Sequence, residues 1–380
     1  MIRVGLLIVA ICNSVLGIEF ESNGYKNVIV SIHPDVSETN GQMIIDNIKV
    51  SVLQITLWHN LTVISFQDFV SQGSQKLFSA SEGYAYINSV KILLPNTWSD
   101  TYQATISSEY FYEDGNIRIN LANPVYADTP YTLQPGGCED PGEYIHLTPE
   151  YITYLQNDSQ LVFGPFENIF ASEWAKLRYG VFDEHGYPGD KNYPLFYYKE
   201  ENVNGNTEFN LKPNFCTNYD IHGRREDPTH GGSCLFDPAT NLPDENCFFV
   251  ATGDNSQITS SLLATPFLKS TKYFSTPDDK CFDKPTKHNA LCKYQSVWEV
   301  IQKNNDFNNG NFKPMNASNP APDTTFEIIQ PDKGGRFVLV LDRSGSMDNH
   351  NRMDRLKQSS TRWIKYDLEE GNKLGVVHFE

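Results

Sequence analysis

An apolar run that leads directly into an Asp-x-Ser-x-Ser motif constrains the fold of this chain more than any other feature. Residues 337–341 are all apolar, which is typical of a parallel strand that is buried on both faces. Asp342, Ser344 and Ser346 follow on one loop, so a carboxylate and two hydroxyls leave the strand together. Magnesium and calcium ions prefer such oxygen ligands. The motif therefore predicts half of a divalent-cation site, although Asp, Ser and Gly also favour turns through local hydrogen bonds.

The residues after the motif predict a strand–helix–strand unit. Residues 353–368 have the pattern of an amphipathic helix, and residues 374–379 that of the next strand. About forty-five residues are too few to bury an α/β core, so we expect the sequence to be part of a longer protein. The rest of the cation site is expected in that missing part.

This segment, residues 334–380, resembles the truncated start of a von Willebrand factor type A domain, which has a Rossmann-like fold. The resemblance implies that Asp342, Ser344 and Ser346 are first-loop ligands of a metal-ion-dependent adhesion site that holds Mg²⁺ or Ca²⁺. It also implies that the remaining coordination position takes a carboxylate from a partner protein.

The N-terminal end predicts export. Arg3 precedes an apolar run over residues 4–12, and small residues follow up to Gly17, so residues 1–17 are expected to be a signal peptide. No later run approaches the roughly 18 to 20 apolar residues that a spanning helix needs. We expect a secreted or extracellular protein, with any membrane association provided by a region beyond residue 380.

The cysteines predict a disulfide framework. Removal of the signal peptide leaves an even number of them, which in a secreted chain indicates disulfides whose pairing stays open. Five lie within residues 216–292 and predict a Cys-rich subdomain. Zinc binding is the competing interpretation, but the chain has no C-x-x-C pair. The six candidates are Cys138, Cys216, Cys234, Cys247, Cys281 and Cys292.

The net charge, the glycosylation sequons and the aromatic content give three further expectations. A formal net charge of −17 disfavours nucleic acid and anionic membranes as partners, without indicating a particular one. Glycosylation sequons begin at Asn60, Asn157 and Asn316, which is consistent with secretion. The aromatic share of 13% fits a large globular core rather than a disordered chain.

The first three hundred residues predict a domain of the α/β or α+β class, because short β-rich runs alternate with polar turns and helical patterns. We expect strands at residues 28–32, 50–55, 79–84 and 90–94, and helices at residues 65–73, 165–179 and 297–302. Gly180 is expected to end the second of these helices. Residues 304–333 begin with a segment rich in Asn and Pro and are expected to be a linker.

The stretch from Ser172 to Glu184 resembles the metalloprotease-like motif of the calcium-activated chloride channel regulator family, in which a helix carries His-Glu-x-x-His and an Asp follows a Gly turn. Further stretches resemble the same family in the same order, at residues 23–25, 130–134, 137–138, 144–149, 288–289 and 298–301. The chain is thereby identified as a member, with a zincin-like N-terminal domain over residues 18–303.

The motif has lost the residue types that its chemistry requires. Two histidines at i and i+4 grip one Zn²⁺ in such a helix, and the intervening Glu activates the metal-bound water. Carried over from the family, Ser172 and Lys176 take the two His positions, Glu173 the base position and Asp183 the third-ligand position. A hydroxyl is a poor zinc ligand and an ammonium repels the ion. We therefore expect no zinc, a vestigial base at Glu173, and Lys176 paired with Glu173 or Asp183.

The resemblance implies a secreted, non-catalytic regulator that binds a membrane channel or an extracellular matrix protein through the cation site. Two alternatives stay open. One is a zinc metallohydrolase with an atypical ligand set, in which His185, His222 or His230 replaces the lost ligands. The other is an extracellular adhesion protein with no connection to chloride conductance.

Overall fold

A computed structural model describes most of the chain. The described residues are 17–38, 66–99, 104–154, 163–203, 206–279, 281–307, 313–332, 336–368 and 373–379. Several expectations lie outside them, namely those for residues 1–16 of the signal peptide, the strand at residues 50–55, and the sequons at Asn60 and Asn157.

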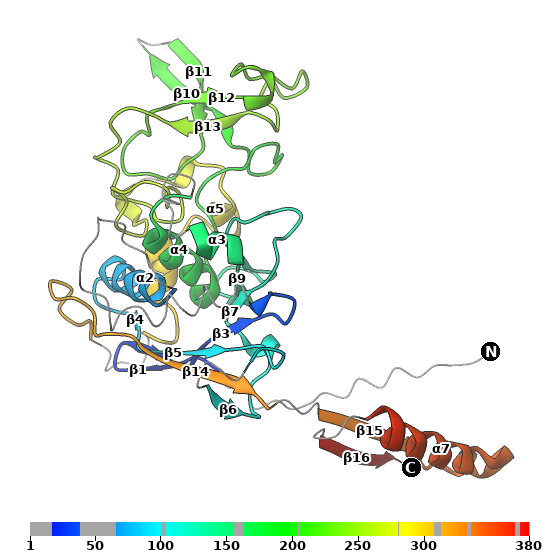
Figure 1. The fold of residues 1–380 in the computed structure, drawn as a ribbon. Helices are drawn as coiled ribbons and strands as arrows, with labels where there is room; N and C mark the ends of the chain where they lie inside the picture. Colours follow the sequence, from blue (N-terminus) through cyan, green and yellow to red (C-terminus); the bar gives the residue numbers. More distant parts are fainter. Residues whose placement is uncertain are drawn as a thin grey trace.

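A seven-stranded sheet forms the centre of the described structure (Figure 1). Its strand order is β6-β14-β5-β3-β7-β9-β8, and every neighbouring pair is parallel except β8 with β9. The antiparallel strand β8 therefore lies at one end of the sheet. The strands are β3 (Val28–Ile32), β5 (Ser89–Leu93), β6 (Thr105–Ser107), β7 (Ile117–Ile119), β8 (Tyr131–Leu133), β9 (Tyr144–Leu147) and β14 (Thr325–Pro331).

Both faces of this sheet are covered, as the alternation along β3 shows. Val28 and Val30 belong to the main hydrophobic core, which also contains residues of the two long helices. Ile29 points to the opposite face, where it packs in a small cluster with Tyr110 and Ile329. Successive side chains of a strand point to opposite faces, so an apolar run is needed when both faces are buried.

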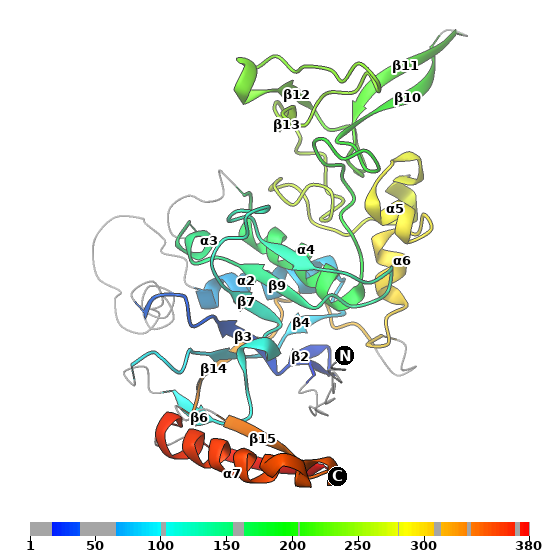
Figure 2. The same ribbon diagram turned by 90° about the vertical axis from the view of Figure 1, so that its right-hand side faces the viewer.

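The two long helices, α2 (Phe66–Ala80) and α4 (Phe166–Tyr179), lie side by side on one face of the sheet (Figures 1 and 2). They approach closely at Gly73, where an added Cβ would lie 2.3 Å from the ring of Phe170. Trp174 of α4 is fully buried in the main hydrophobic core. The core thus fixes the orientation of α4, the helix that carries the degenerate motif.

None of the helices in the described ranges has the length and apolar composition that a membrane-spanning helix requires.

The other elements of the N-terminal domain are short. The small sheet consists of β1 (Glu19–Glu21), β2 (Gly24–Lys26) and β4 (Tyr86–Ile87). The short helices are η3 (Tyr112–Asp114), α3 (Pro149–Tyr154), η6 (Pro277–Asp279), η7 (Cys281–Asp283), α5 (Lys287–Leu291) and α6 (Val297–Gln302).

The expected helices are confirmed, with one change of length. The helix at residues 165–179 is α4, the helix at 297–302 is α6, and the helix at 65–73 is the first part of α2. The strand expected at residues 79–84 is wrong. Helix α2 continues through Ala80 because Leu77 and Phe78 extend its buried face, and the next strand is β4.

The expected linker at residues 304–333 also needs correction. It contains β14, which pairs in parallel with both β5 and β6 and is therefore an internal strand of the main sheet. Asp306 is tied to α4 as well, because it accepts two hydrogen bonds from Arg178, at 2.6 and 2.7 Å. The Asn- and Pro-rich composition obscured a segment that belongs to the folded domain.

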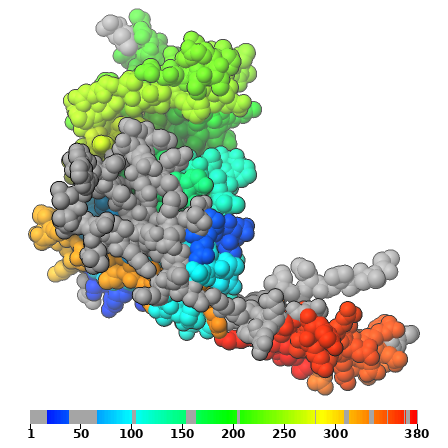
Figure 3. Space-filling view, in the orientation of Figure 1, coloured from blue at the N-terminus to red at the C-terminus, as the bar shows by residue number. Residues whose placement is uncertain are grey.

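Three disulfides confirm that the six cysteines are paired, as Cys138–Cys292, Cys216–Cys281 and Cys234–Cys247. The last two disulfides lie entirely within the Cys-rich segment. The first joins Cys292, at the end of that segment, to Cys138 in the loop before β9. Most of the Cys-rich segment lies at one end of the molecule, far from the strands of the sheet (Figures 1 and 3). It contains β12 (Gly223–Glu226), η5 (Pro228–His230) and β13 (Phe248–Ala251). The hairpin of β10 (Phe196–Val203) and β11 (Asn206–Pro213) precedes it in the sequence.

The C-terminal segment forms the expected strand–helix–strand unit. Strands β15 (Arg336–Asp342) and β16 (Lys373–Phe379) pair in parallel. Between them lie η8 (Gly345–Asn351), α7 (Arg352–Arg362) and the π-helical turn η9 (Trp363–Asp367). The expectation that β15 is buried is wrong for the described structure, since Val338 is 64% exposed. The only described strand beside β15 is β16, and α7 covers one face of the pair.

The long-range disulfide should contribute most to stability. Loop-closure entropy predicts that the double substitution Cys138→Ala, Cys292→Ala lowers the free energy of unfolding by about 4 to 5 kcal/mol, because the bridge spans 154 residues. The matched pair Cys234→Ala, Cys247→Ala spans 13 residues and should cost about 3 kcal/mol. Urea unfolding monitored by circular dichroism measures both. A larger loss for the short-range pair would contradict the expectation.

Candidate functional site

The position of the site is set by the C-terminal end of α4. The helix ends at Gly180, whose φ of +66° favours glycine. A Cβ at Gly180 would also lie 2.3 Å from the backbone of Asp140. The turn that glycine permits brings Asp183 back beside the last turns of the helix.

Lys176 lies between two carboxylates. Its Nζ is 2.7 Å from Oε1 of Glu173 and 2.9 Å from Oδ1 of Asp183. The Lys176 side chain is 12% exposed and that of Glu173 only 9%. The three-residue spacing places Glu173 and Lys176 on the same face of α4. The expected pairing of Lys176 is confirmed, and it involves both carboxylates rather than one.

A hydroxyl holds the second oxygen of each carboxylate. Thr132 on β8 donates from Oγ1 to Oε2 of Glu173 at 2.7 Å, and the hydroxyl of Tyr187 donates to Oδ2 of Asp183. Sequence reasoning missed both residues. Thr132 lies in one of the stretches that resemble the family, but nothing in the sequence places β8 beside α4. Tyr187 carries no signal beyond its proximity to Asp183 in sequence.

Burial and ion pairing together determine the charges of this cluster. Burial disfavours the charged form of Lys176, but the attraction of Asp183 and Glu173 outweighs it and raises the pKa of the amine. Burial raises the pKa of Glu173, against the opposing effect of Lys176. Burial also opposes ionisation of Asp183, yet Lys176, His185 and the Tyr187 hydrogen bond lower the pKa of this carboxyl. Lys176 is therefore an ammonium at neutral pH.

Ser172 is turned away from the carboxylates. Its hydroxyl lies 2.9 Å from the carbonyl oxygen of Asn168 and 2.8 Å from that of Leu262, and it donates to one of them at a time. The residue is 3% exposed. Hydrogen bonding to Asn168, one turn earlier, is a common use of a serine inside a helix. The Leu262 contact shows that another segment packs directly against Ser172, which the resemblance places at the first His position of the motif.

These residues do not fit a zinc ion. Of the three predicted zinc-ligand positions, only Asp183 offers a zinc-binding group, and both of its oxygens already accept bonds from Lys176 and Tyr187. The ammonium of Lys176 would repel a cation between the carboxylates. The Ser172 hydroxyl is committed to backbone carbonyls.

The histidines considered as substitutes do not restore a ligand set. His185 directs Nδ1 to the carbonyl of Gly186 at 3.0 Å. His230 pairs with Asp227 at 2.8 Å, and His222 also belongs to the Cys-rich segment. Across the described ranges, no three His, Cys, Asp or Glu side chains are grouped so that they could hold a metal ion.

The loop after β15 brings the other three predicted ligand positions together. The backbone N–H of Ser344 donates to Oδ1 of Asp342 at 2.8 Å, and the hydroxyl oxygens of Ser344 and Ser346 lie 3.0 Å apart. The Ser344 hydrogen bonds lower the pKa of Asp342, so the carboxylate stays ionised. An ionised carboxylate beside two hydroxyls is a donor set of oxygen atoms, which fits Mg²⁺ or Ca²⁺.

One predicted glycosylation site can be placed. Asn316 is exposed, and its Oδ1 accepts a hydrogen bond from the backbone of Ser318 at 3.0 Å. The sequon therefore lies on the surface within the corrected linker segment.

Comparison with known proteins identifies the family. Residues 18–316 match the family described as "Calcium-activated chloride channel N terminal", which is most of the chain. The chain belongs to the calcium-activated chloride channel regulator family. The resemblance on which the sequence analysis relied is thereby confirmed. No solved structure matches the chain.

Several curated relatives align along almost the whole chain. Calcium-activated chloride channel regulator 1 of Mus musculus is 31% identical over 379 residues, which is 99% of this chain and 38% of the relative. The Homo sapiens protein of the same name is 31% identical over 375 residues, 98% and 36% respectively. Regulator 3A-1 of Mus musculus is 30% identical over 365 residues, 96% and 36%. The chain thus spans little more than a third of these relatives.

Lys176→Met should destabilise the N-terminal domain by about 3–5 kcal/mol at pH 7, because it leaves the buried carboxylate of Glu173 and the partly buried carboxylate of Asp183 without their shared cation. Urea unfolding at several pH values measures the loss. The difference from wild type should shrink as the pH falls from 7 towards 4, because the unpaired carboxylates then take up protons. Wild-type Asp183, whose pKa is depressed, loses its stabilising contribution only below its unfolded value of about 3.9.

Lys199→Met provides a matched control. Lys199 pairs with Asp283 at 2.7 Å, but both side chains are more than a third exposed. Its loss should cost at most about 1 kcal/mol. Equal losses for the two variants, or a Lys176→Met difference that does not change with pH, would show that the Lys176 cluster is hydrated and contributes little.

Proposed function

We propose that the protein is a secreted, non-catalytic member of its family that acts by cation-dependent binding of a membrane channel or an extracellular matrix protein. One observation carries the non-catalytic part of the proposal, namely the ammonium of Lys176 between the carboxylates of Glu173 and Asp183. The family membership and the grouped oxygen ligands after β15 support the binding part.

The arrangement around Glu173 removes the means of hydrolysis. A zincin-like fold, which we propose for the N-terminal domain, uses this glutamate as a general base towards a metal-bound water. Here one oxygen of Glu173 faces Lys176 and the other accepts the Thr132 hydrogen bond. The carboxylate is thus held as an ion-pair partner. The site stabilises the contact of α4 with β8 instead of activating water.

The binding part of the proposal rests on the loop of Asp342. We propose that β15, α7 and β16 begin a von Willebrand factor type A domain, in which Asp342, Ser344 and Ser346 would hold Mg²⁺ or Ca²⁺. When bound, such an ion supplies an electrophilic position for a carboxylate of the partner. The residues themselves orient the site: the Ser344 N–H keeps the Asp342 carboxylate ionised, and the Ser344–Ser346 contact holds the two hydroxyls together.

Metal analysis tests the non-catalytic proposal. The purified protein, dialysed after exposure to zinc, should hold much less than one zinc per chain and should cleave no peptide from a mixed library. Inductively coupled plasma mass spectrometry measures the metal content. About one zinc per chain, retained through dialysis and lost on Asp183→Ala, would contradict the proposal and favour a metallohydrolase with an atypical ligand set.

A substitution at the cation site tests the binding proposal. Asp342→Ala in the full-length protein should abolish Mg²⁺ binding measured by calorimetry, because it removes the only carboxylate among the three ligand positions. It should also abolish any change that the added protein causes in the calcium-activated chloride current of patch-clamped cells. Asp354→Ala, in the first turn of α7, removes the same charge outside the loop and should leave both unchanged.

EDTA should reproduce the effect of Asp342→Ala on the wild-type protein. A different result would contradict the binding proposal. If the Asp342→Ala protein still changed the chloride current, and EDTA did not alter the effect of the wild-type protein, the partner would bind a metal-independent surface and not the cation site.

A further inference from the structure

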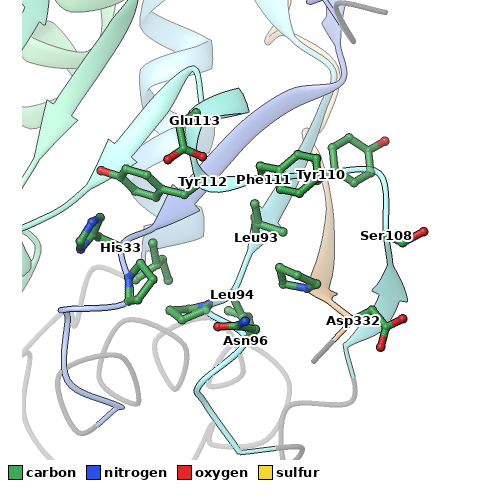
Figure 4. A pocket seen from close by; sticks show the side chains of 14 residues that line it. His33, Leu93, Leu94, Asn96, Ser108, Tyr110, Phe111, Tyr112, Glu113 and Asp332 are labelled. Atoms are coloured by element: carbon green, nitrogen blue, oxygen red, sulfur yellow. The ribbon is translucent and has the colours of Figure 1, made fainter. Parts of the chain in front are cut away.

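A cleft opens at the carboxyl ends of three adjacent parallel strands, β3, β5 and β14 (Figure 4). Its volume is about 310 Å³. That is the low end of the roughly 300 to 1,000 Å³ range of small-ligand sites, enough for one or two side chains. The carboxyl ends of parallel strands are where α/β sheets commonly bind ligands. The cleft is separate from both α4 and the loop of Asp342.

The walls of the cleft are largely apolar and have little conformational freedom. A proline lies at or just beyond the end of each of the three strands, at Pro34, Pro95 and Pro331. The run from Tyr110 to Tyr112 forms the opposite wall. Tyr110 is buried and Phe111 is 49% exposed. Prolines and aromatic rings lose little entropy when they contact a ligand, so such walls favour binding of an apolar chain.

The charged side chains that line the cleft are acidic. Arg118 lies beside it, because its guanidinium donates to the backbone carbonyl of Glu113 and lies 5.7 Å from the centre of the Tyr112 ring. Glu113 and Asp332 lie on different sides of the cleft, and none of its lining residues is a lysine or arginine. No hydrogen bond or ion pair with a described residue engages the Glu113 carboxylate. Asp332 already binds one ammonium, that of Lys373 on β16, at 2.7 Å. The charge of the Glu113 carboxylate therefore favours a cationic ligand over an anionic one.

We propose that this cleft binds an arginine-containing peptide segment of a partner protein. The aliphatic part of the arginine side chain would lie between the prolines and the aromatic wall, as long cationic side chains lie on apolar surfaces. Its guanidinium would reach Glu113, where it gains a charge-assisted hydrogen bond. The acidity of the chain as a whole favours approach of a basic segment.

Fluorescence anisotropy with two labelled peptides tests the proposal. The probe is an acetylated, amidated Gly-Leu-Arg-Leu-Gly peptide, and its counterpart carries citrulline, which has nearly the same shape without the charge. The arginine peptide should bind the full chain about fivefold more tightly or better, and added salt should reduce the difference. Glu113→Gln should weaken binding of the arginine peptide about two- to fivefold and leave binding of the citrulline peptide unchanged.

Glu109→Gln is the matched control, because Glu109 is exposed, lies four residues away and does not line the cleft. It should leave binding unchanged. Equal binding of the two peptides, no binding of either, or equal effects of the two substitutions would overturn the proposal. If the small amine agmatine displaced the probe as strongly as unlabelled peptide does, the occupant would be a small amine. If the peptide instead broke up a dimer of the chain, the occupant would be a second copy.

Discussion

The ammonium of Lys176 is the interaction on which the centre of this domain depends. Two carboxylates in a nearly buried position need a cation, since an unpaired buried charge costs several kcal/mol. A metal ion can meet that need in a zincin-like site, but here the cation is covalently part of α4. It pairs with Glu173 of the same helix and with Asp183 after the Gly180 turn. The position that a metal ion would take between the two carboxylates is therefore occupied by the Lys176 ammonium.

The surrounding contacts make the cluster a junction between elements. Thr132 connects it to the edge strand β8, and Tyr187 connects it to the loop between α4 and β10. The end of α4 is anchored a second time, because Arg178 forms a bidentate pair with Asp306, whose carboxylate also accepts a bond from the Tyr25 hydroxyl at 2.8 Å. Ion pairs and three disulfides therefore connect the elements of this domain.

Local patterns in the sequence predicted what depends on local chemistry. The three-residue spacing of Glu173 and Lys176 predicted their pairing because helix geometry places the two side chains on one face. Gly180 predicted the end of the helix because glycine readily adopts the left-handed turn found there. The contact with Thr132 could not be predicted, since it depends on how the sheet edge packs on the helix. Strand β14 (Thr325–Pro331) was hidden by its polar neighbourhood, and the Cys292 pairing required the three-dimensional path of the chain.

X-ray diffraction at the zinc absorption edge tests the central claim most directly. Crystals of the protein grown in the presence of zinc should show no anomalous peak between Glu173 and Asp183, and the electron density there should continue from the Lys176 side chain to its Nζ. An anomalous peak between the two carboxylates, with the Lys176 side chain displaced towards solvent, would contradict the account. It would show that the site still prefers a metal ion to the amine of the chain itself.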